Sequence, residues 1–133
     1  MRMKYDELIK AARSAREKAY APYSGYSVGA ALLCENGEIY TGCNVENSSI
    51  GLTICAERTA AVKAISDGER RFKAICIIGG RTGENACVAC FPCGMCRQFL
   101  SEFAADDMQV ILPCENDVQI YDFKSLFPHG FKL

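Results

Sequence analysis

Three cysteines and one glutamate, in two short segments, are the residues of this 133-residue sequence best suited to chemistry. Cys55 and Glu57 belong to the first segment, and Cys93 and Cys96 belong to the second. A Cys-x-x-Cys pair on the first turn of a helix directs two sulfurs to one point, and a third thiolate from another helix can complete a trigonal base. Three protein ligands with an open fourth position are typical of catalytic zinc, whereas structural zinc sites usually have four. The spacing therefore predicts one zinc ion per chain, bound by the three cysteines.

Glu57 follows Cys55 by two residues, which is too close on a helix for a good second ligand but near enough to reach solvent at the metal. A carboxylate in this place can accept a proton and pass it on, first as a general base and then as a general acid. Three thiolates around a divalent cation leave a net negative charge. Arg58 and Arg97, close to the ligands in the sequence, are expected to offset that charge.

The sequence holds nine cysteines, and Cys87 and Cys90 extend the spacing of Cys93 and Cys96 upstream. These four cysteines at every third residue, called the cysteine ladder below, leave two alternatives open. One is a closed structural zinc site and the other is an iron–sulfur cluster. We interpret Cys87 and Cys90 as loop thiols outside the metal site. Four further cysteines lie singly on apolar stretches and are expected to be core residues, namely Cys34, Cys43, Cys76 and Cys114.

Composition excludes several classes of protein. There are 15 Lys and Arg against 16 Asp and Glu, so the chain lacks the basic surface that binding to nucleic acid phosphates requires. Its apolar runs are shorter than the roughly 20 residues that cross a membrane, and its first residues do not resemble a signal peptide. We expect a cytoplasmic protein with a single catalytic domain over residues 1–133, without a nucleic acid or membrane partner.

Hydrophobic periodicity indicates which elements position these residues. Helices are expected over residues 4–20, 55–66 and 93–103, with a further helix at the end of the chain. Strands are expected over residues 27–34, 38–43, 72–78, 108–112 and 118–121. This order predicts an α/β fold, in which one mixed sheet carries helices on both faces.

Several segments, in this order and with suitable gaps, resemble the small homotetrameric cytidine deaminases that bind zinc through cysteines alone. They are Tyr20–Ser24, Val28–Leu32, Gly42–Asn47, Cys55–Ala60, Pro92–Gln98 and Leu126–Pro128. The resemblance implies a three-layer α/β/α fold with a five-stranded mixed sheet. It also implies a homotetramer and the zinc-dependent hydrolysis of cytidine and deoxycytidine to uridine and deoxyuridine plus ammonia, in pyrimidine salvage.

The resemblance also assigns roles to single residues. Cys55, Cys93 and Cys96 match the zinc ligands, and Glu57 matches the proton shuttle. Residues that match substrate contacts are Asn44 and Glu46 for the sugar 3′-hydroxyl, Ala56 for a backbone contact to the base, Tyr26 for the base pocket, and Phe131 for the site of a neighbouring subunit.

Two rival functions remain open. Tyr26 stands where the family more often has Phe, which would suit a relative that acts on a cytosine-bearing antibiotic such as blasticidin S. The intact pair of Asn44 and Glu46 argues against that substrate, because the pair is suited to a sugar hydroxyl. A structural zinc or iron–sulfur module is the other rival, but such a module has no need of Glu57 beside its ligands.

Overall fold

The sheet contains five strands in the order β2-β1-β3-β4-β5. The structure is a computed structural model that describes residues 2–86 and 88–133, with side chains described from residue 5 onward. β1 pairs antiparallel with both β2 and β3, β3 pairs parallel with β4, and β4 pairs antiparallel with β5. The predicted mixed sheet is therefore confirmed. Its strands are β1 (Tyr26–Cys34), β2 (Ile39–Cys43), β3 (Phe72–Arg81), β4 (Ala104–Pro113) and β5 (Val118–Asp122).

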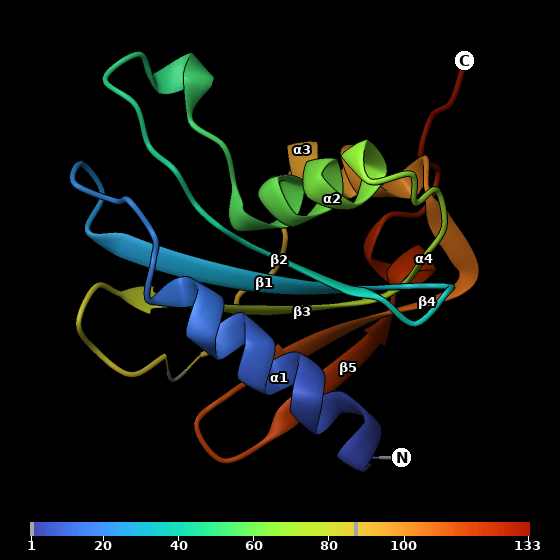
Figure 1. The fold of residues 1–133 in the computed structure, drawn as a ribbon, viewed down its shortest axis with the longest axis horizontal. Helices are drawn as coiled ribbons and strands as arrows, with labels where there is room; N and C mark the ends of the chain where they lie inside the picture. The colour runs from blue at the N-terminus through green and yellow to red at the C-terminus, as the bar shows by residue number, and fades with distance from the viewer. Residues whose placement is uncertain (1, 87) are drawn as a thin grey trace.

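Helices cover both faces of this sheet, as Figure 1 shows. One face packs against α1 (Arg2–Arg16), and the other face packs against α2 (Ala56–Ser66), α3 (Gly94–Ser101) and the short α4 (Phe123–Leu126). A 3₁₀ turn, η1 (Ile50–Leu52), lies in the loop before α2. The three-layer α/β/α fold expected from the resemblance is thus confirmed.

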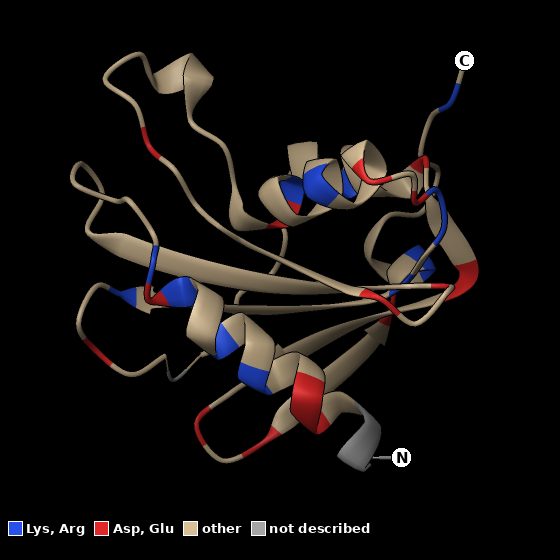
Figure 2. Ribbon diagram, viewed as in Figure 1, with Lys and Arg blue, Asp and Glu red and all other residues tan. Residues whose placement is uncertain are grey.

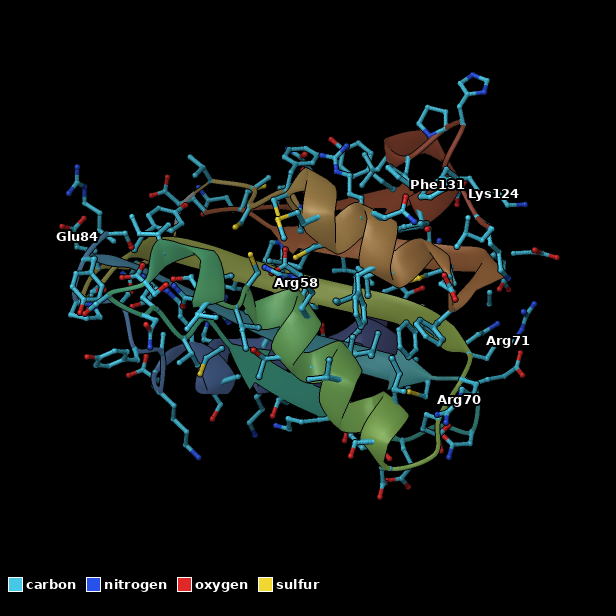
Figure 3. All side chains as sticks on the ribbon, turned by 90° about the horizontal axis from the view of Figure 1, so that it is seen from above. Arg58, Arg70, Arg71, Glu84, Lys124 and Phe131 are labelled. Carbon is cyan, nitrogen blue, oxygen red and sulfur yellow. The ribbon has the colours of Figure 1, made fainter. Side chains whose placement is uncertain are left out.

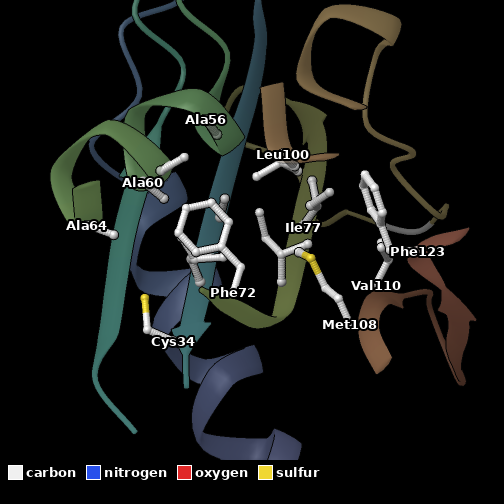
Figure 4. Close-up of a cluster of buried hydrophobic side chains, with 14 of the residues drawn as sticks. Cys34, Ala56, Ala60, Ala64, Phe72, Ile77, Leu100, Met108, Val110 and Phe123 are labelled. Carbon is white, nitrogen blue, oxygen red and sulfur yellow. The ribbon is translucent and has the colours of Figure 1, made fainter. Parts of the chain in front are cut away.

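Strand alternation explains the two cores. Along β1, Ala30 and Leu32 face α2, while Ala31 faces α1. Successive side chains of a strand point to opposite faces, so a strand buried on both faces is apolar throughout. The larger core lies between the sheet and α2 and α3, where Phe72 is fully buried against the small side chains of α2 (Figure 4).

Helix α1 ends earlier than the sequence predicts, at Arg16 rather than at residue 20. Beyond the helix, the Tyr20 backbone forms a bridge to Val45, and the Tyr20 N–H donates to the Asn44 carbonyl at 3.0 Å. The chain therefore leaves the helix because its backbone groups are used in tertiary pairing, which the apolar periodicity could not indicate. This bridge places residues 20–26 beside residues 44–46.

The boundary between α3 and β4 also differs from the prediction. The helix ends at Ser101 rather than at residue 103, and the strand begins at Ala104 rather than at residue 108. The Phe103 carbonyl accepts a hydrogen bond of 2.8 Å from the Phe72 N–H, which draws the chain onto the sheet at that point. The polar residues that begin the strand, such as Asp107, are tolerated because their side chains reach solvent, where Asp107 pairs with Lys73 at 2.9 Å.

A glycine lets α2 lie directly on β2. A Cβ atom at Gly42 would lie 2.5 Å from the Ala60 nitrogen and 2.6 Å from the Ala56 oxygen, both of them backbone atoms of α2. Only glycine permits this approach of helix to strand. The start of α2, and with it Cys55 and Glu57, is therefore held close to the sheet.

Candidate metal centre and active site

The three cysteines lie at the starts of two helices, as the sequence predicts. Cys55 immediately precedes α2, and Cys93 immediately precedes α3; both have extended backbone conformations typical of a residue that caps a helix. Cys96 lies within the first turn of α3 and is fully buried. Figure 3 shows Arg58 between α2 and α3, close to the yellow sulfur atoms.

The sulfur atoms of these cysteines converge on a single point. All three lie within 4.8 Å of one another, and the Cys55 and Cys93 sulfurs are 3.8 Å apart. Tetrahedral zinc with Zn–S bonds of about 2.3 Å requires its sulfur ligands to be about 3.8 Å apart. None of the three forms a disulfide. The donor set therefore fits zinc in both chemistry and spacing.

Arg58 provides positive charge to this cluster. Its Nη2 donates to the Cys55 sulfur at 3.5 Å, and its buried Nε has no hydrogen-bond partner among the residues that the structure describes. The pKa of Cys55 falls to about 5, because its thiolate accepts hydrogen bonds, first from Cys96 and then from Arg58 and Cys93. The same contact between the two thiols raises the pKa of Cys96. One cysteine of the cluster is thus stabilised as the thiolate that a metal requires.

Arg97 makes different contacts from those expected of a charge-compensating residue. Its Nε donates to the Pro92 carbonyl at 2.8 Å, and its Nη1 donates to the Leu126 carbonyl at 2.6 Å. These two bonds tie the turn before Cys93 to the end of α4. The sequence reasoning missed this fastening role, because hydrogen bonds to distant backbone carbonyls leave no mark in the sequence.

Glu57 is buried beside the sulfur cluster, with 4% of its surface exposed. Burial raises its pKa to about 7, and the nearby Cys55 thiolate adds to the rise. A hydrogen bond from its own backbone N–H, the Arg58 charge and a hydrogen bond from Cys96 oppose it. A carboxyl group that titrates near neutral pH can both accept and release a proton during turnover. This property is what the predicted proton shuttle requires.

Cys90 lies apart from the sulfur cluster. Within the described part of the chain, the group of potential metal ligands consists of Cys55, Cys93 and Cys96. Cys90 packs instead over β3, where a Cβ atom at Gly79 would lie 2.6 Å from its sulfur. Burial raises the pKa of Cys90 to about 12, which makes it a poor nucleophile. Cys87, the other cysteine of the upstream ladder, lies outside the described residues.

The remaining cysteines follow the sequence prediction only in part. Cys34 and Cys76 are buried core residues, as expected. Cys43 and Cys114 are half-buried, so the prediction that they belong to the core is wrong. Cys43 is the last residue of β2, an edge strand of the sheet, and Cys114 follows the last residue of β4.

Asn44 and Glu46 lie on a segment that leads directly to the metal cluster. The intervening Val45 forms paired backbone hydrogen bonds of 2.9 Å with Ile54, the residue before Cys55. Asn44 and Glu46 are two residues apart in this extended segment, so their side chains share one side of it. The structure thus brings the backbone between the two predicted sugar contacts next to the residue that precedes Cys55.

Both side chains are held by backbone groups. Asn44 Oδ1 accepts from the Val28 N–H at 2.9 Å, and its Nδ2 donates to the Tyr26 carbonyl at 2.8 Å. Glu46 Oε1 accepts from the N–H groups of Tyr23 at 2.9 Å and Ser24 at 3.1 Å, while the Ser24 hydroxyl donates to Oε2. The hydrogen bond from this hydroxyl is the main cause of a lowered pKa for Glu46. No pattern in the sequence predicts this role of Ser24.

Three comparisons with known proteins bear on this arrangement. The family model described as "Cytidine and deoxycytidylate deaminase zinc-binding region" matches residues 2–112. The chain belongs to this deaminase family. A cytidine deaminase from Sporosarcina psychrophila is 45% identical over 130 residues, which is 97% of this chain and 92% of that protein. A crystal structure of cytidine deaminase from Burkholderia pseudomallei superimposes with a TM-score of 0.85 at 44% identity, covering 96% of this chain and 98% of the other.

These relationships confirm that the protein is an enzyme of the cytidine deaminase family and that its cofactor is zinc. A second relative, the cytidine deaminase of Halalkalibacterium halodurans, is 44% identical over 125 residues, or 93% of this chain and 91% of that protein. In the described part of this deaminase, no helix has the length and apolarity needed to cross a membrane.

The other predicted substrate contacts of the deaminase lie in two separate regions. Ala56 is fully buried at the start of α2, and Tyr26 is 37% exposed at the start of β1. Phe131 is 65% exposed, and its carbonyl accepts a hydrogen bond of 3.0 Å from Gln98, on the half of α3 far from Cys93. Figure 3 shows Phe131 well away from Arg58, toward the C-terminal end of α3. The structure therefore does not bring Phe131 to the metal cluster of its own chain.

Proposed function

We propose that this deaminase hydrolyses cytidine and 2′-deoxycytidine to uridine and 2′-deoxyuridine with release of ammonia, in pyrimidine salvage. The observation that carries the proposal is the buried Glu57 carboxyl beside three convergent cysteine sulfurs. A metal-binding module without catalysis has no use for an acid in that position, whereas hydrolysis of an amidine requires repeated proton transfers.

The cysteines, Glu57 and the two arginines have separate roles in the proposed reaction. Cys55, Cys93 and Cys96 hold the zinc, which when bound supplies an activated water for attack on C4 of the pyrimidine. Glu57 accepts the proton of that water and transfers it to N3 of the base. Glu57 then takes the remaining proton from the oxygen now bonded to C4 and gives it to the exocyclic nitrogen, so that the C4–N bond breaks, C4=O forms and ammonia leaves. Arg58 offsets the negative charge of the three thiolates. Arg97 donates to the Pro92 and Leu126 carbonyls, so it is proposed to add its positive charge to this offset without a hydrogen bond to a sulfur.

Asn44 and Glu46 are proposed to bind the 3′-hydroxyl of the sugar. Asn44 Nδ2 has a second hydrogen to donate, and Glu46 has further lone pairs to accept with, so together they can satisfy both functions of a hydroxyl group. The Ala56 backbone and the Tyr26 side chain are the proposed contacts to the base. Because the sugar-binding pair is intact, a nucleoside is favoured over a cytosine-bearing antibiotic.

We propose the cytoplasm as the compartment of this enzyme.

A free nucleoside is also favoured over a polynucleotide as the substrate. The formal net charge is −1, and Figure 2 shows Lys and Arg interspersed with Asp and Glu. Binding to single-stranded DNA or RNA usually involves a continuous basic groove.

We further propose that the chain forms one catalytic domain over residues 1–133 and assembles as a homotetramer with shared active sites. Phe131 is exposed and lies well away from Arg58 of its own chain (Figure 3), so its ring is available to a neighbouring chain. Apolar side chains also line a hollow of about 500 Å³, which a second subunit could cover. They are Val62 and Ile65 of α2, Phe99 of α3, and Phe103, which follows α3.

The experiment that tests this proposal is a substrate panel. Zinc-loaded enzyme is incubated with cytidine, 2′-deoxycytidine, deoxycytidylate, blasticidin S and a cytosine-containing single-stranded oligonucleotide, and the products are identified by mass. We expect deamination of the two nucleosides at least tenfold faster than that of the other compounds, since one good hydrogen-bonded contact commonly contributes about tenfold. Faster turnover of the antibiotic, the nucleotide or the oligonucleotide would overturn the proposal.

A further inference from the structure

Ser24 lies where the predicted sugar-binding and base-binding residues meet. Its hydroxyl donates to Glu46 Oε2 and accepts from the Tyr26 N–H at 3.0 Å. We propose that Ser24 is a positioning residue, which fixes the Glu46 carboxylate in the orientation that binds the 3′-hydroxyl of the nucleoside. This inference rests on the proposed function, because it takes Glu46 to be a substrate contact.

The carboxylate of Glu46 needs such a contact because its other hydrogen bonds hold only one oxygen. The N–H groups of Tyr23 and Ser24 both donate to Oε1. The terminal torsion of a glutamate is soft, so bonds to one oxygen leave the plane of the carboxylate free to turn. The Ser24 hydroxyl holds the second oxygen and thereby fixes that plane.

The direction of the hydroxyl is itself determined by the structure. A serine hydroxyl has one hydrogen, and its oxygen already accepts the Tyr26 N–H. The single hydrogen is therefore left to point at Glu46. On the other side of the same residue, the Tyr26 carbonyl accepts from Asn44 Nδ2 at 2.8 Å. The backbone of Tyr26 therefore positions both side chains. It contacts Asn44 directly and Glu46 through Ser24.

The turn that carries Ser24 is itself held in place. The Gly25 N–H donates to the Ala21 carbonyl at 3.0 Å, and the Gly25 carbonyl accepts from the Thr82 N–H at 2.8 Å. Gly25 has a φ of +67°, which glycine adopts without strain. Ser24 is exposed, so loss of its hydroxyl opens no cavity in the core. Its substitution therefore tests orientation rather than folding.

The test is the variant Ser24→Ala, measured on cytidine and on 3′-deoxycytidine, which lacks the hydroxyl in question. We expect kcat/KM on cytidine to fall about tenfold, mainly through KM, the size of one charge-assisted hydrogen bond. On 3′-deoxycytidine we expect a loss of less than about twofold, because the oriented carboxylate has nothing to bind there. An effect transmitted through Tyr26 to the base would instead lower both values equally.

Two further variants serve as controls. Ser24→Thr retains the hydroxyl and should keep the preference for cytidine. Ser48→Ala removes another serine hydroxyl between the same two segments, one that bonds Tyr23 Oη at 2.6 Å and not Glu46. This variant should leave both kcat/KM values unchanged.

The outcomes separate the two proposals. If the wild-type enzyme does not prefer cytidine over 3′-deoxycytidine, the sugar contact of Glu46 is wrong, and the role of Ser24 falls with it. If the wild type prefers cytidine and Glu46→Gln removes the preference while Ser24→Ala keeps it, only the role of Ser24 is overturned. Equal losses on both substrates for Ser24→Ala would also overturn it.

Discussion

The sulfur atoms of Cys55 and Cys93 lie 3.8 Å apart although 38 positions separate them in the chain. Each residue caps a different helix, so a metal bound between them joins the starts of α2 and α3. Glu57 lies in the first turn of α2 and is carried to the same point. Metal binding, helix packing and the position of the acid are therefore coupled in this enzyme.

Removal of zinc should change which thiols react. In the zinc-loaded protein we expect Cys55, Cys93 and Cys96 to resist iodoacetamide. After chelation we expect the exposed Cys93 and the half-buried Cys55 thiolate to label before the buried Cys96. Burial raises the pKa of Cys76 to about 12, and burial, together with nearby Glu69 and Glu38, raises that of Cys34 to about 11. These two thiols should therefore react slowly in both states and serve as internal controls. Peptide mass spectrometry measures each site. Rapid labelling of Cys93 with zinc bound would contradict the assignment of ligands.

Glu57→Gln should abolish most of the turnover without loss of zinc. The amide keeps the shape of the side chain but cannot accept the proton, and general acid–base steps contribute about 10²–10⁴-fold. We expect kcat to fall by at least that range, with metal content per chain unchanged. Glu84→Gln, in an exposed loop, is the matched control and should have normal activity. Near-normal activity of Glu57→Gln would refute the proton shuttle.

Arg58→Met should weaken the metal centre. The variant retains the aliphatic length of the side chain but loses the guanidinium that donates to the Cys55 sulfur. Residues that contact metal ligands typically contribute about 10–100-fold to metal affinity or activity, and we expect a loss of zinc affinity in that range. Competition with a chromophoric chelator measures it. Arg13→Met, on the exposed side of α1, should retain wild-type affinity; equal affinities for all three proteins would contradict the role of Arg58.

Phe131→Ala tests the shared active site. If the ring stacks on a pyrimidine bound in a neighbouring chain, its loss should weaken substrate binding by roughly 1–3 kcal/mol while zinc content stays constant. Ile120→Ala, which truncates another exposed apolar side chain, should have no such effect.

A mixture of two variants extends this test. When Phe131→Ala is mixed with Glu57→Gln, some sites should combine an intact Glu57 with an intact Phe131 from different chains, so activity should exceed the sum of the two separate proteins. Tagged co-purification must show that subunits have exchanged. No gain after proven exchange, or a fully active monomer by light scattering, would exclude the shared site.

Local sequence signals predicted the elements of the fold well. The apolar runs of β1 and β3 and the Cys-x-x-Cys pair at the start of α3 each act over a few residues, and the structure confirms them. Boundaries set by tertiary pairing were missed. Helix α1 ends at Arg16 because Tyr20 pairs with Val45, a partner that no pattern near residue 20 announces.

In the candidate site, too, local sequence patterns predicted the residues within one helical turn, and contacts between distant segments were missed. The spacing of Cys93 and Cys96 and the order of Cys55 and Glu57 were sufficient to predict the metal cluster, because each pair lies within one helical turn. The contacts of Arg97 with Pro92 and Leu126, and of Ser24 with Glu46, depend on segments brought together only by folding. Contacts of this kind are seen only in the folded structure and cannot be predicted from local sequence patterns.

The most direct test of the central claim is to measure cytidine deamination and zinc content on the same samples. Preparations with graded zinc loading are assayed by the loss of cytidine absorbance, and metal is quantified in each. The account predicts a rate that rises in proportion to zinc and saturates at about one ion per chain, as expected for a single three-cysteine site. Full activity without zinc, or an inactive protein with zinc fully bound, would contradict it.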